Sequence, residues 1–349
     1  MKRITINDVA QKAGVSKSTV SHVINNTRFV EAATRQKVLD AISDLNYRPS
    51  SIARSLVKKQ TSTVGLLISD VSNPFYHEVI HGVEGVALEN SYDIFLCNTH
   101  YDLKQAMKFV QSLEDKQVDG VLCMTSSMSR DILVELSSNH IPMVVLDWHT
   151  AEINDLAATI SIDFSKGIYD AVAHLVELGH RHFAHVSGPL SFWSSRLRRD
   201  LFLEALSKFD IDPGSALIVE GNLRIDGGRK ALANIIKVEP RPTAVFAAND
   251  LMALGMIWAA RDHHLQIPND LSIVGLDNIE LGTQITPTLT TVSLPRFDIG
   301  AMAMSTLLKL MDESGQLKIN PADFSQVVST ELIIRDSTKQ SYLKETHKA

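Results

Sequence analysis

Cysteine is almost absent from this 349-residue chain. The two that occur, Cys97 and Cys123, lie in apolar runs that predict strands, so we expect small buried side chains and no disulfide framework. Long hydrophobic runs are absent too, since no stretch approaches the roughly 18 consecutive apolar residues of a membrane-spanning helix. The first residues lack the apolar segment of a secretion signal. These absences predict a cytoplasmic protein.

Patterns of catalytic and metal-binding residues are missing as well. The thirteen histidines include His180, His182 and the pair His263 and His264, but none stands at metal-ligand spacing from a cysteine. The chain has no G-x-S-x-G motif and no glycine-rich phosphate loop, and the Asp-Gly-Gly run at 226–228 is better explained as a turn into a helix. We therefore expect no enzyme activity, no metal and no cofactor.

Charge is distributed unevenly along the chain. The whole chain has a net charge of −6, which argues against a nucleic-acid partner when taken as an average. Residues 1–60, however, contain eleven Lys and Arg against four Asp and Glu, so this head carries +7 and the remainder −13. A basic head on an acidic body is typical of a protein of which one end alone contacts a polyanion.

The first 47 residues show helical spacing without strand-like alternation. The pattern predicts a helix that ends at Gly14, a second that begins at Ser16, and a third after it. The apolar positions are Val9, Ala10, Ala13, Val20, Val23, Ile24, Val38, Ile42 and Leu45. Beyond Pro49, residues 50–56 allow only about two further helical turns, too short to be stable alone in water. Residues 58–62 are polar and predict a linker.

After Thr63 the pattern changes to short apolar runs separated by helical segments. Such runs, alternating with helices of roughly 12–20 residues, predict parallel sheets with helices on both faces. We expect two α/β lobes, the first with strands at 64–69, 93–98, 120–124 and 142–147, the second with strands at 158–162, 182–188, 215–221, 243–249 and 271–277. Ligands bind outside the carboxyl ends of such strands.

The segment from Thr5 to Asn25, TINDVAQKAGVSKSTVSHVIN, resembles the helix-turn-helix of the lactose/galactose repressor family. Gly14 permits the tight turn, and Val20 and Val23 pack the second helix on the first. The polar side chains left on the second helix suit the base edges of the DNA major groove. The DNA-binding residues that the resemblance implies here are Thr5, Ser16, Lys17, Ser18, Thr19, Ser21, His22 and Asn25, with Arg28 and Lys37 at phosphates.

The stretch from Asn46 to Leu56 also resembles this family, whose paired hinge helices enter the minor groove and insert a leucine between base pairs. The resemblance implies DNA contacts by Ala53 and Leu56, with Leu56 as the wedge that kinks the duplex. Family members often carry Lys after this leucine, and this chain departs from them with Val57.

The resemblance extends to about Arg335, is closest to the ribose and purine repressors, and makes the second part similar to periplasmic sugar-binding proteins. It implies an all-α helix-turn-helix DNA-binding domain followed by a two-lobed, periplasmic-binding-protein-like α/β sensor domain. We assign the DNA-binding domain to residues 1–48, the hinge and linker to 49–62, the ligand-binding and dimerisation domain to 63–340, and a polar tail to 341–349.

Polar and aromatic residues at the strand ends form the predicted ligand site. The run Asn73-Pro74-Phe75-Tyr76 matches the ribose-binding members. Sugars stack on aromatic rings, and their hydroxyls accept charge-assisted hydrogen bonds. Asp or Asn at a strand end can instead cap the next helix, which stays an alternative for each. The predicted ligand-binding residues are Asn73, Phe75, Tyr76, Asp147, Trp148, Phe192, Ser194, Arg198, Asn249 and Asp277.

Three positions bear on the ligand. Phe192 stands where purine repressors place an arginine, while Leu223 and Leu294 replace an aromatic and a glutamine of the ribose pattern. The resemblance implies a homodimeric repressor that binds palindromic operator DNA and is induced by a small sugar, of pentose-like size. A purine-responsive repressor that needs a corepressor is one alternative. A sugar-binding transport receptor is another, although it leaves residues 1–60 unexplained.

Replacing Leu56 with Ala should weaken binding to a palindromic operator by about tenfold or more, because an inserted side chain offsets a kinking cost of a few kcal/mol. Binding to random DNA should change far less, since no kinked step forms there. Fluorescence anisotropy titrations of both DNAs at one salt concentration measure this difference. Equal losses on the two DNAs contradict the wedge role.

Overall fold

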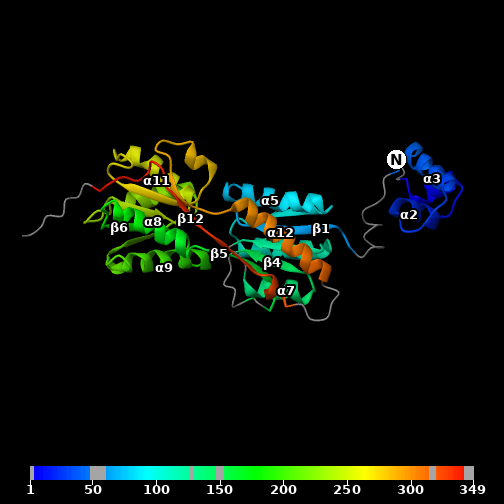
Figure 1. The fold of residues 1–349 in the computed structure, drawn as a ribbon, viewed down its shortest axis with the longest axis horizontal. Helices are drawn as coiled ribbons and strands as arrows, with labels where there is room; N and C mark the ends of the chain where they lie inside the picture. Colours follow the sequence, from blue (N-terminus) through cyan, green and yellow to red (C-terminus); the bar gives the residue numbers. More distant parts are fainter. Residues whose placement is uncertain are drawn as a thin grey trace, which may run out of the picture. The chain divides into compact units, whose positions relative to one another are not determined.

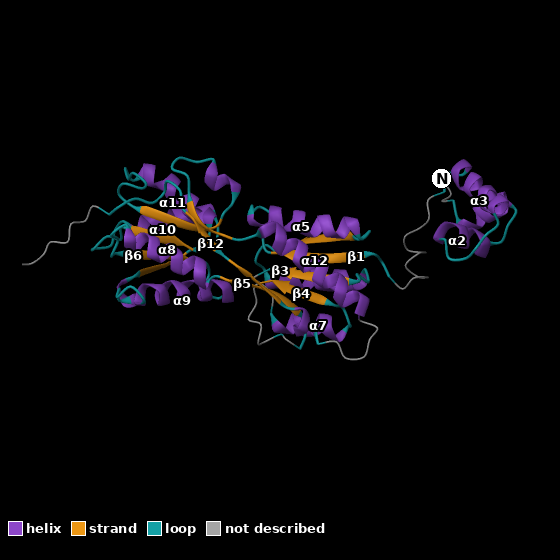
Figure 2. Ribbon diagram, viewed as in Figure 1, coloured by secondary structure: helices purple, strands orange, loops and turns teal. Residues whose placement is uncertain are grey.

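The structure is a computed structural model that describes residues 4–47, 60–125, 129–146, 153, 155–313 and 320–341. The chain separates into two compact units, residues 1–62 and 63–349. The described part of the first is helical, and the second combines sheets with helices (Figures 1 and 2).

Residues 4–47 form three helices, α1 (Ile6–Ala13), α2 (Lys17–Asn25) and α3 (Ala32–Asp44). Gly14 ends α1 with a φ of 66°, a left-handed conformation that glycine adopts without strain. Ser16 caps α2, because its Oγ accepts a hydrogen bond from the Thr19 amide at 3.1 Å. The predicted helices and the turn at Gly14 are thus confirmed. They share a small core of Val9, Ala10, Val20, Val23, Val38, Ala41 and Tyr47.

The first lobe of the second unit is built on a parallel sheet of order β11-β5-β4-β3-β1-β2. Helices α5 and α12 pack on one face with Leu66 and Leu122, and α6 and α7 pack on the other with Leu67 and Cys123. The elements are β1 (Thr63–Ile68), α5 (Phe75–Glu89), β2 (Asp93–Asn98), α6 (Leu103–Asp115), β3 (Gly120–Met124), α7 (Arg130–Ser138), β4 (Met143–Leu146), β5 (Ala158–Asp163), α12 (Arg296–Glu313), η4 (Pro321–Phe324) and β11 (Gln326–Ser329).

The second lobe has a sheet of order β12-β10-β9-β8-β6-β7, parallel except for β12 against β10. Phe183 and Phe246 share a core with α8 and α9, whereas Val186 and Val245 share one with α10 and α11. The elements are α8 (Ser165–Glu177), β6 (Phe183–Ser187), α9 (Trp193–Ser207), η2 (Pro213–Ser215), β7 (Leu217–Glu220), α10 (Ile225–Ile235), β8 (Ala244–Ala247), α11 (Asp250–Asp262), β9 (Ser272–Asp277), η3 (Glu280–Thr283), β10 (Thr290–Ser293) and β12 (Glu331–Ile333).

In the described residues the chain passes between the lobes at three places. These crossovers run from β5 through Phe164 to α8, from β10 to α12, and from β11 through Thr330 to β12. Two of them are tied together, since the Thr330 hydroxyl donates to the Asp163 carbonyl at 2.9 Å and accepts from the Gly167 amide at 3.2 Å.

Two expectations about this unit are wrong. The strand at 158–162 belongs to the first sheet and not the second, because β5 pairs with β4 and β11. The run 226–228 lies within α10 and is not a turn before it. A Cβ on Gly228 would come within 2.0 Å of the Met252 carbonyl oxygen, so glycine here allows α10 to approach α11 closely. The short strands β10, β11 and β12 were not predicted at all.

A histidine is fully buried in the second lobe. His185 of β6 packs against Phe202 and Phe246, whose rings also stack on each other, and its Nδ1 donates to the Phe246 carbonyl at 2.9 Å. Its Nε2 has no partner among the described residues. Burial lowers the pKa of His185 to about 4, against the hydrogen bond to Phe246, which raises it.

The folded chain therefore keeps His185 neutral at pH values where the unfolded chain, with an ordinary imidazole, binds a proton. The buried neutral imidazole does not lower the free energy of unfolding above about pH 6.5. As the pH falls from there toward 4, the free energy of unfolding decreases, and at pH 5 the loss is about 2 kcal/mol. The variant His185→Leu should remove this part of the acid destabilisation. Urea unfolding at pH 7 and pH 5 measures it, with the exposed His182→Leu as control. An unchanged pH difference in His185→Leu contradicts the prediction.

Candidate functional site

Helix α2 presents most of the predicted DNA-binding side chains. Ser16, Lys17 and Ser18 are exposed, and Thr19, Ser21, His22 and Asn25 are half-buried. Several are held by short-range hydrogen bonds: His22 Nδ1 lies 2.9 Å from Thr27 Oγ1, and Asn25 Nδ2 donates to the Ser21 carbonyl at 3.0 Å. Thr5 precedes α1 and forms a capping box with Asp8. The side chains on α2 are thus oriented before any contact with DNA.

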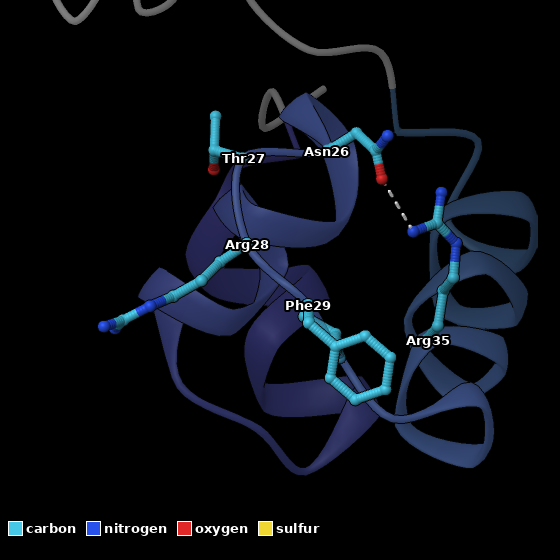
Figure 3. Close-up of a pocket in the computed structure, with 6 residues that line it drawn as sticks. Asn26, Thr27, Arg28, Phe29 and Arg35 are labelled. Carbon is cyan, nitrogen blue, oxygen red and sulfur yellow. Dashed lines mark hydrogen bonds between the residues drawn. The ribbon is translucent and has the colours of Figure 1, made fainter.

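The loop after α2 holds a residue that the sequence reasoning missed. The Phe29 side chain is 94% exposed, beside the exposed Arg28. Together with Arg35, whose Nη1 donates to Asn26 Oδ1 at 3.1 Å, the loop borders a hollow of about 400 Å³ (Figure 3). An aromatic residue next to Arg28, in the connection between two predicted helices, was the available signal. Lys37 is exposed on α3.

Four predicted site residues lie outside the described residues: Ala53 and Leu56 of the hinge, and Asp147 and Trp148 after β4.

In the second unit, the loop after β1 carries Asn73, and the first turn of α5 carries Phe75 and Tyr76. Asn73 is buried, and its Oδ1 accepts from the Phe75 amide at 3.0 Å, which fixes the start of α5. The Phe75 and Tyr76 rings meet edge to face with centroids 5.1 Å apart. Tyr76 is buried, and burial raises the pKa of its hydroxyl to about 12 despite hydrogen bonds with Ser69.

The charges of Arg198 and Asp277, both in the other lobe, act on this tyrosine. The negative charge of Asp277 raises the pKa of Tyr76 further and the positive charge of Arg198 lowers it, so both act on its hydroxyl. Arg198 is held by the Ala248 carbonyl at 2.9 Å and by the Phe164 ring, 4.5 Å from its guanidinium carbon. Tyr76 in α5, Arg198 in α9 and Asp277 at the end of β9 thus influence one another electrostatically across the two lobes.

Asp277 has an unusual backbone. Its φ is 123°, a backbone conformation that non-glycine residues rarely adopt. Its carbonyl accepts a hydrogen bond from Arg296 at the start of α12. The buried Asp250 holds the adjoining loop, because it accepts from the Ile279 amide at 2.8 Å and from Thr291 Oγ1 at 2.6 Å. Burial raises the pKa of Asp250 to about 6. This scaffold fixes where the Asp277 carboxylate stands.

The remaining predicted residues take other positions. Asn249 is buried, accepts from the Met252 amide at 3.0 Å as the cap of α11, and donates to the Leu223 carbonyl at 2.9 Å. Its observed contacts are those of a structural cap. Phe192 stacks on Tyr101, and Ser194 is half-buried in the first turn of α9.

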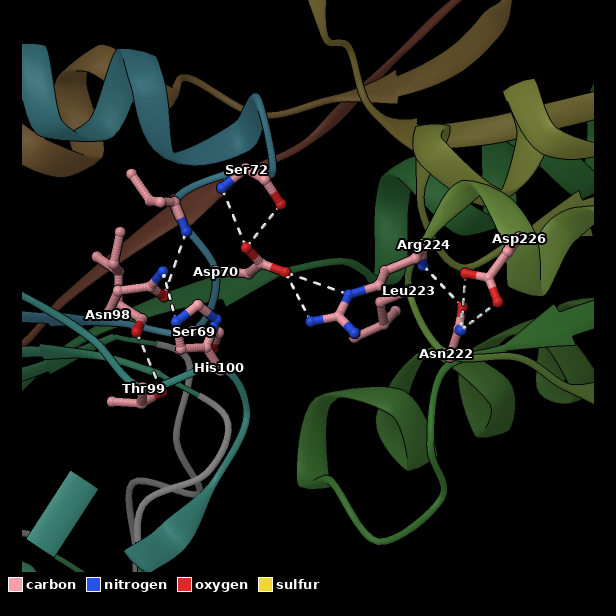
Figure 4. A network of polar contacts seen from close by, with 12 residues as sticks. Ser69, Asp70, Ser72, Asn98, Thr99, His100, Asn222, Leu223, Arg224 and Asp226 are labelled. Carbon is pink, nitrogen blue, oxygen red and sulfur yellow. Dashed lines mark hydrogen bonds and ion pairs between the residues drawn. The ribbon is translucent and has the colours of Figure 1, made fainter. Parts of the chain in front are cut away.

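Three residues near the site were not predicted. Arg224, which precedes α10, forms an ion pair of 2.8 Å with Asp70, which follows β1 in the other lobe (Figure 4). Tyr101 follows β2 and contacts the second lobe. All three come after strands, so the rule that places ligands at strand ends could have indicated them.

Comparison with known proteins identifies the family. Residues 5–50 match the model for bacterial regulatory proteins of the lacI family, and residues 172–338 match that for a periplasmic binding protein-like domain. The HTH-type transcriptional repressor PurR of Edwardsiella ictaluri is 41% identical over 305 residues, which cover 87% of this chain and 89% of that protein. The chain belongs to the lacI family.

Other lacI-family proteins show the same architecture. Catabolite control protein A of Priestia megaterium is 37% identical over 89% of this chain and 93% of its own length. The lac repressor dimer bound to operator and an anti-inducer has a TM-score of 0.82 at 27% identity, covering 97% of this chain and all of that one. The chain is thus a DNA-binding transcriptional repressor with a helix-turn-helix domain and a two-lobed ligand-binding domain.

Two absences concern the described residues alone. None of their helices combines the length and hydropathy of a membrane span. No group of three or more His, Cys, Asp or Glu among them is arranged to hold a metal ion.

Replacing Asn249 with Ala should lower the free energy of unfolding by about 2 kcal/mol, since it removes a helix cap and leaves the buried Leu223 carbonyl without its donor. The variant Asn249→Ser keeps a capping oxygen and should lose less. Thermal unfolding without ligand measures both. A melting temperature equal to the wild type in Asn249→Ala would assign this residue to ligand binding alone.

Proposed function

We propose that this repressor binds a palindromic operator as a homodimer and that a monosaccharide of pentose-like size, bound between the lobes, releases it from DNA. The observation that carries the effector site is the approach of the two lobes at their strand ends, where Asp70 of the first lobe pairs with Arg224 of the second at 2.8 Å and the charges of Arg198 and Asp277 act on Tyr76. The cytoplasm, where operator DNA lies, is its proposed place of action.

The chemistry of these residues suits a sugar. Asp277 offers a carboxylate acceptor and Arg198 a fork of donors, and both make stronger hydrogen bonds to hydroxyls than neutral groups do. The ring of Phe75 stands beside Tyr76, and an aromatic ring suits the apolar face of a sugar. A lacI-family regulator of Enterococcus faecium, 27% identical over 80% of this chain with a TM-score of 0.71, has bound ribose.

We infer the dimer from the short length of α2, the helix proposed to contact base edges. Helix α2 spans nine residues and contacts only a few base pairs, so specific recognition requires two half-sites and a two-fold axis. The lac repressor of similar fold is bound to its operator as a dimer. Lys17, His22 and Asn25 would face base edges, and Arg28 a phosphate.

The switch follows from differential affinity. A ligand that contacts Tyr76 in one lobe and Arg198 and Asp277 in the other favours the arrangement in which the lobes approach each other. The ligand changes operator affinity only if the two helix-turn-helix domains of the dimer fit DNA differently in that arrangement. Release of DNA by the sugar is the direction we propose.

A purine corepressor is the second candidate. The relative of 41% identity is a repressor named PurR, which favours it. Phe192 argues for the sugar, because its ring stacks on Tyr101 with centroids 5.8 Å apart and has no donor for a purine.

A thermal-shift screen of monosaccharides, sugar phosphates and purine bases, followed by operator titration with any compound that stabilises the protein, decides between the two. We expect a sugar to raise the melting temperature and weaken operator binding. The variants Arg198→Ala and Asp277→Ala should lose both effects. Arg229→Ala, which breaks an ion pair with Asp262 within the second lobe, should keep both. A purine that stabilises the protein and tightens operator binding would overturn the proposal.

A further inference from the structure

Two contacts join the lobes beside the proposed effector site. Asp70 Oδ2 accepts hydrogen bonds from Arg224 Nε at 3.2 Å and Nη2 at 2.8 Å, so both nitrogens reach one carboxylate oxygen (Figure 4). Tyr101 of the first lobe stacks on Phe192 of the second, with 20° between the rings. The Arg224 guanidinium lies 5.6 Å from the centre of the Tyr101 ring, which makes the four residues one cluster. We call this cluster the clasp.

Each lobe prepares its half of the clasp. Asp70 is buried, and its second oxygen accepts from the Ser72 amide at 3.1 Å and hydroxyl at 2.7 Å, so the carboxylate is oriented from within its own lobe. Burial acts to raise the pKa of Asp70, but the hydrogen bonds from Ser72 and Arg224 outweigh it and the pKa is lowered. The carboxylate is therefore charged at neutral pH.

Tyr101 is held in place by a strained backbone. His100 and Tyr101 have φ values of 53° and 61°, and two successive non-glycine residues in this region are uncommon. Such strain persists where the surrounding structure compensates for it, and it concentrates at ligand sites. Burial raises the pKa of the Tyr101 hydroxyl, and the neighbouring Tyr76, Asp70 and Asp277 raise it further. The stack on Phe192 and the Arg224 guanidinium over its ring fix the position of Tyr101 between the lobes.

The sheet order places the clasp opposite the crossovers. Tyr101 follows β2 and Arg224 follows β7, and these strands end their sheets on one side. The crossovers leave from β5, β10 and β11, which lie at or next to the other end. The other two members of the clasp, Asp70 and Phe192, follow β1 and β6, the strands next to β2 and β7, and Asp277 ends β9, farther into its sheet. The clasp therefore spans the side at which the lobes can separate.

We propose that Asp70, Tyr101, Phe192 and Arg224 determine the effector's size by joining the lobes at the mouth of the site, so that a single-ring ligand fits behind them. A ligand with a second ring would have to extend through the cluster and break it. This inference rests on the proposed effector site between the lobes.

The first experiment tests the clasp without any ligand. Spin labels on Lys104→Cys and Lys230→Cys, both exposed, report the separation of the lobes by double electron-electron resonance in full-length protein diluted with unlabelled chains. The native cysteines are fully buried and take no label. Arg224→Gln and Asp70→Asn should each lengthen or broaden the distance distribution. Arg229→Ala, which breaks a 2.9 Å ion pair confined to one lobe, should leave it unchanged. Identical distributions in all four proteins overturn the proposal.

The second experiment tests size selection by calorimetry with D-ribose, D-glucose and adenine, and with cellobiose and adenosine as ligands that carry one ring more. The wild type should bind the smaller compound of a pair, D-glucose against cellobiose or adenine against adenosine, at least tenfold more tightly than the larger. The double variant Tyr101→Ala, Arg224→Ala should reduce that ratio at least tenfold, and an unchanged ratio overturns the proposal. If no compound binds the wild type, the proposed effector fails, while the distance measurement still decides whether the clasp exists.

Discussion

Parallel strands set the position of every functional side chain in the second unit. In each lobe the strands run in one direction, apart from β12, so every loop from a strand to the following helix emerges at one edge of the sheet. Residues as distant in sequence as Asp70 and Arg224 meet because both stand in such loops. Had either sheet been antiparallel, these loops would be shared between two edges and the site would lose half of its side chains.

Local chemistry in the sequence predicted local structure well. Gly14 and Ser16 mark the turn and the cap that the structure shows, because each acts on its own backbone. The alternation of strand and helix predicted two α/β lobes, and strand ends predicted where Tyr76, Arg198 and Asp277 lie. The family resemblance supplied the helix-turn-helix and the two-lobed fold.

Pairing between distant elements could not be predicted in this way. The run 158–162 has the same apolar character whichever sheet it joins, so its place beside β4 depends on contacts that periodicity does not encode. Thr290–Ser293 and Gln326–Ser329 are too short and polar to stand out as strands. Asn249 illustrates a third limit, since a capping residue and a ligand-binding residue at a strand end have the same sequence signature. The contacts of Tyr101 likewise depend on a backbone conformation that its neighbours in sequence do not dictate.

The three crossovers mean that neither lobe is a continuous piece of chain. The first lobe uses residues 63–163 and 296–329, and the second uses residues 165–293 and 331–333. During synthesis the helices of residues 4–47 are complete before either sheet, because the first sheet waits for β11 and the second for β12. Synthesis thus imposes an order on maturation: the helix-turn-helix domain can form before the two-lobed ligand-binding domain. A nascent or truncated chain that stops short of residue 326 would carry the complete helices of residues 4–47 together with two incomplete sheets.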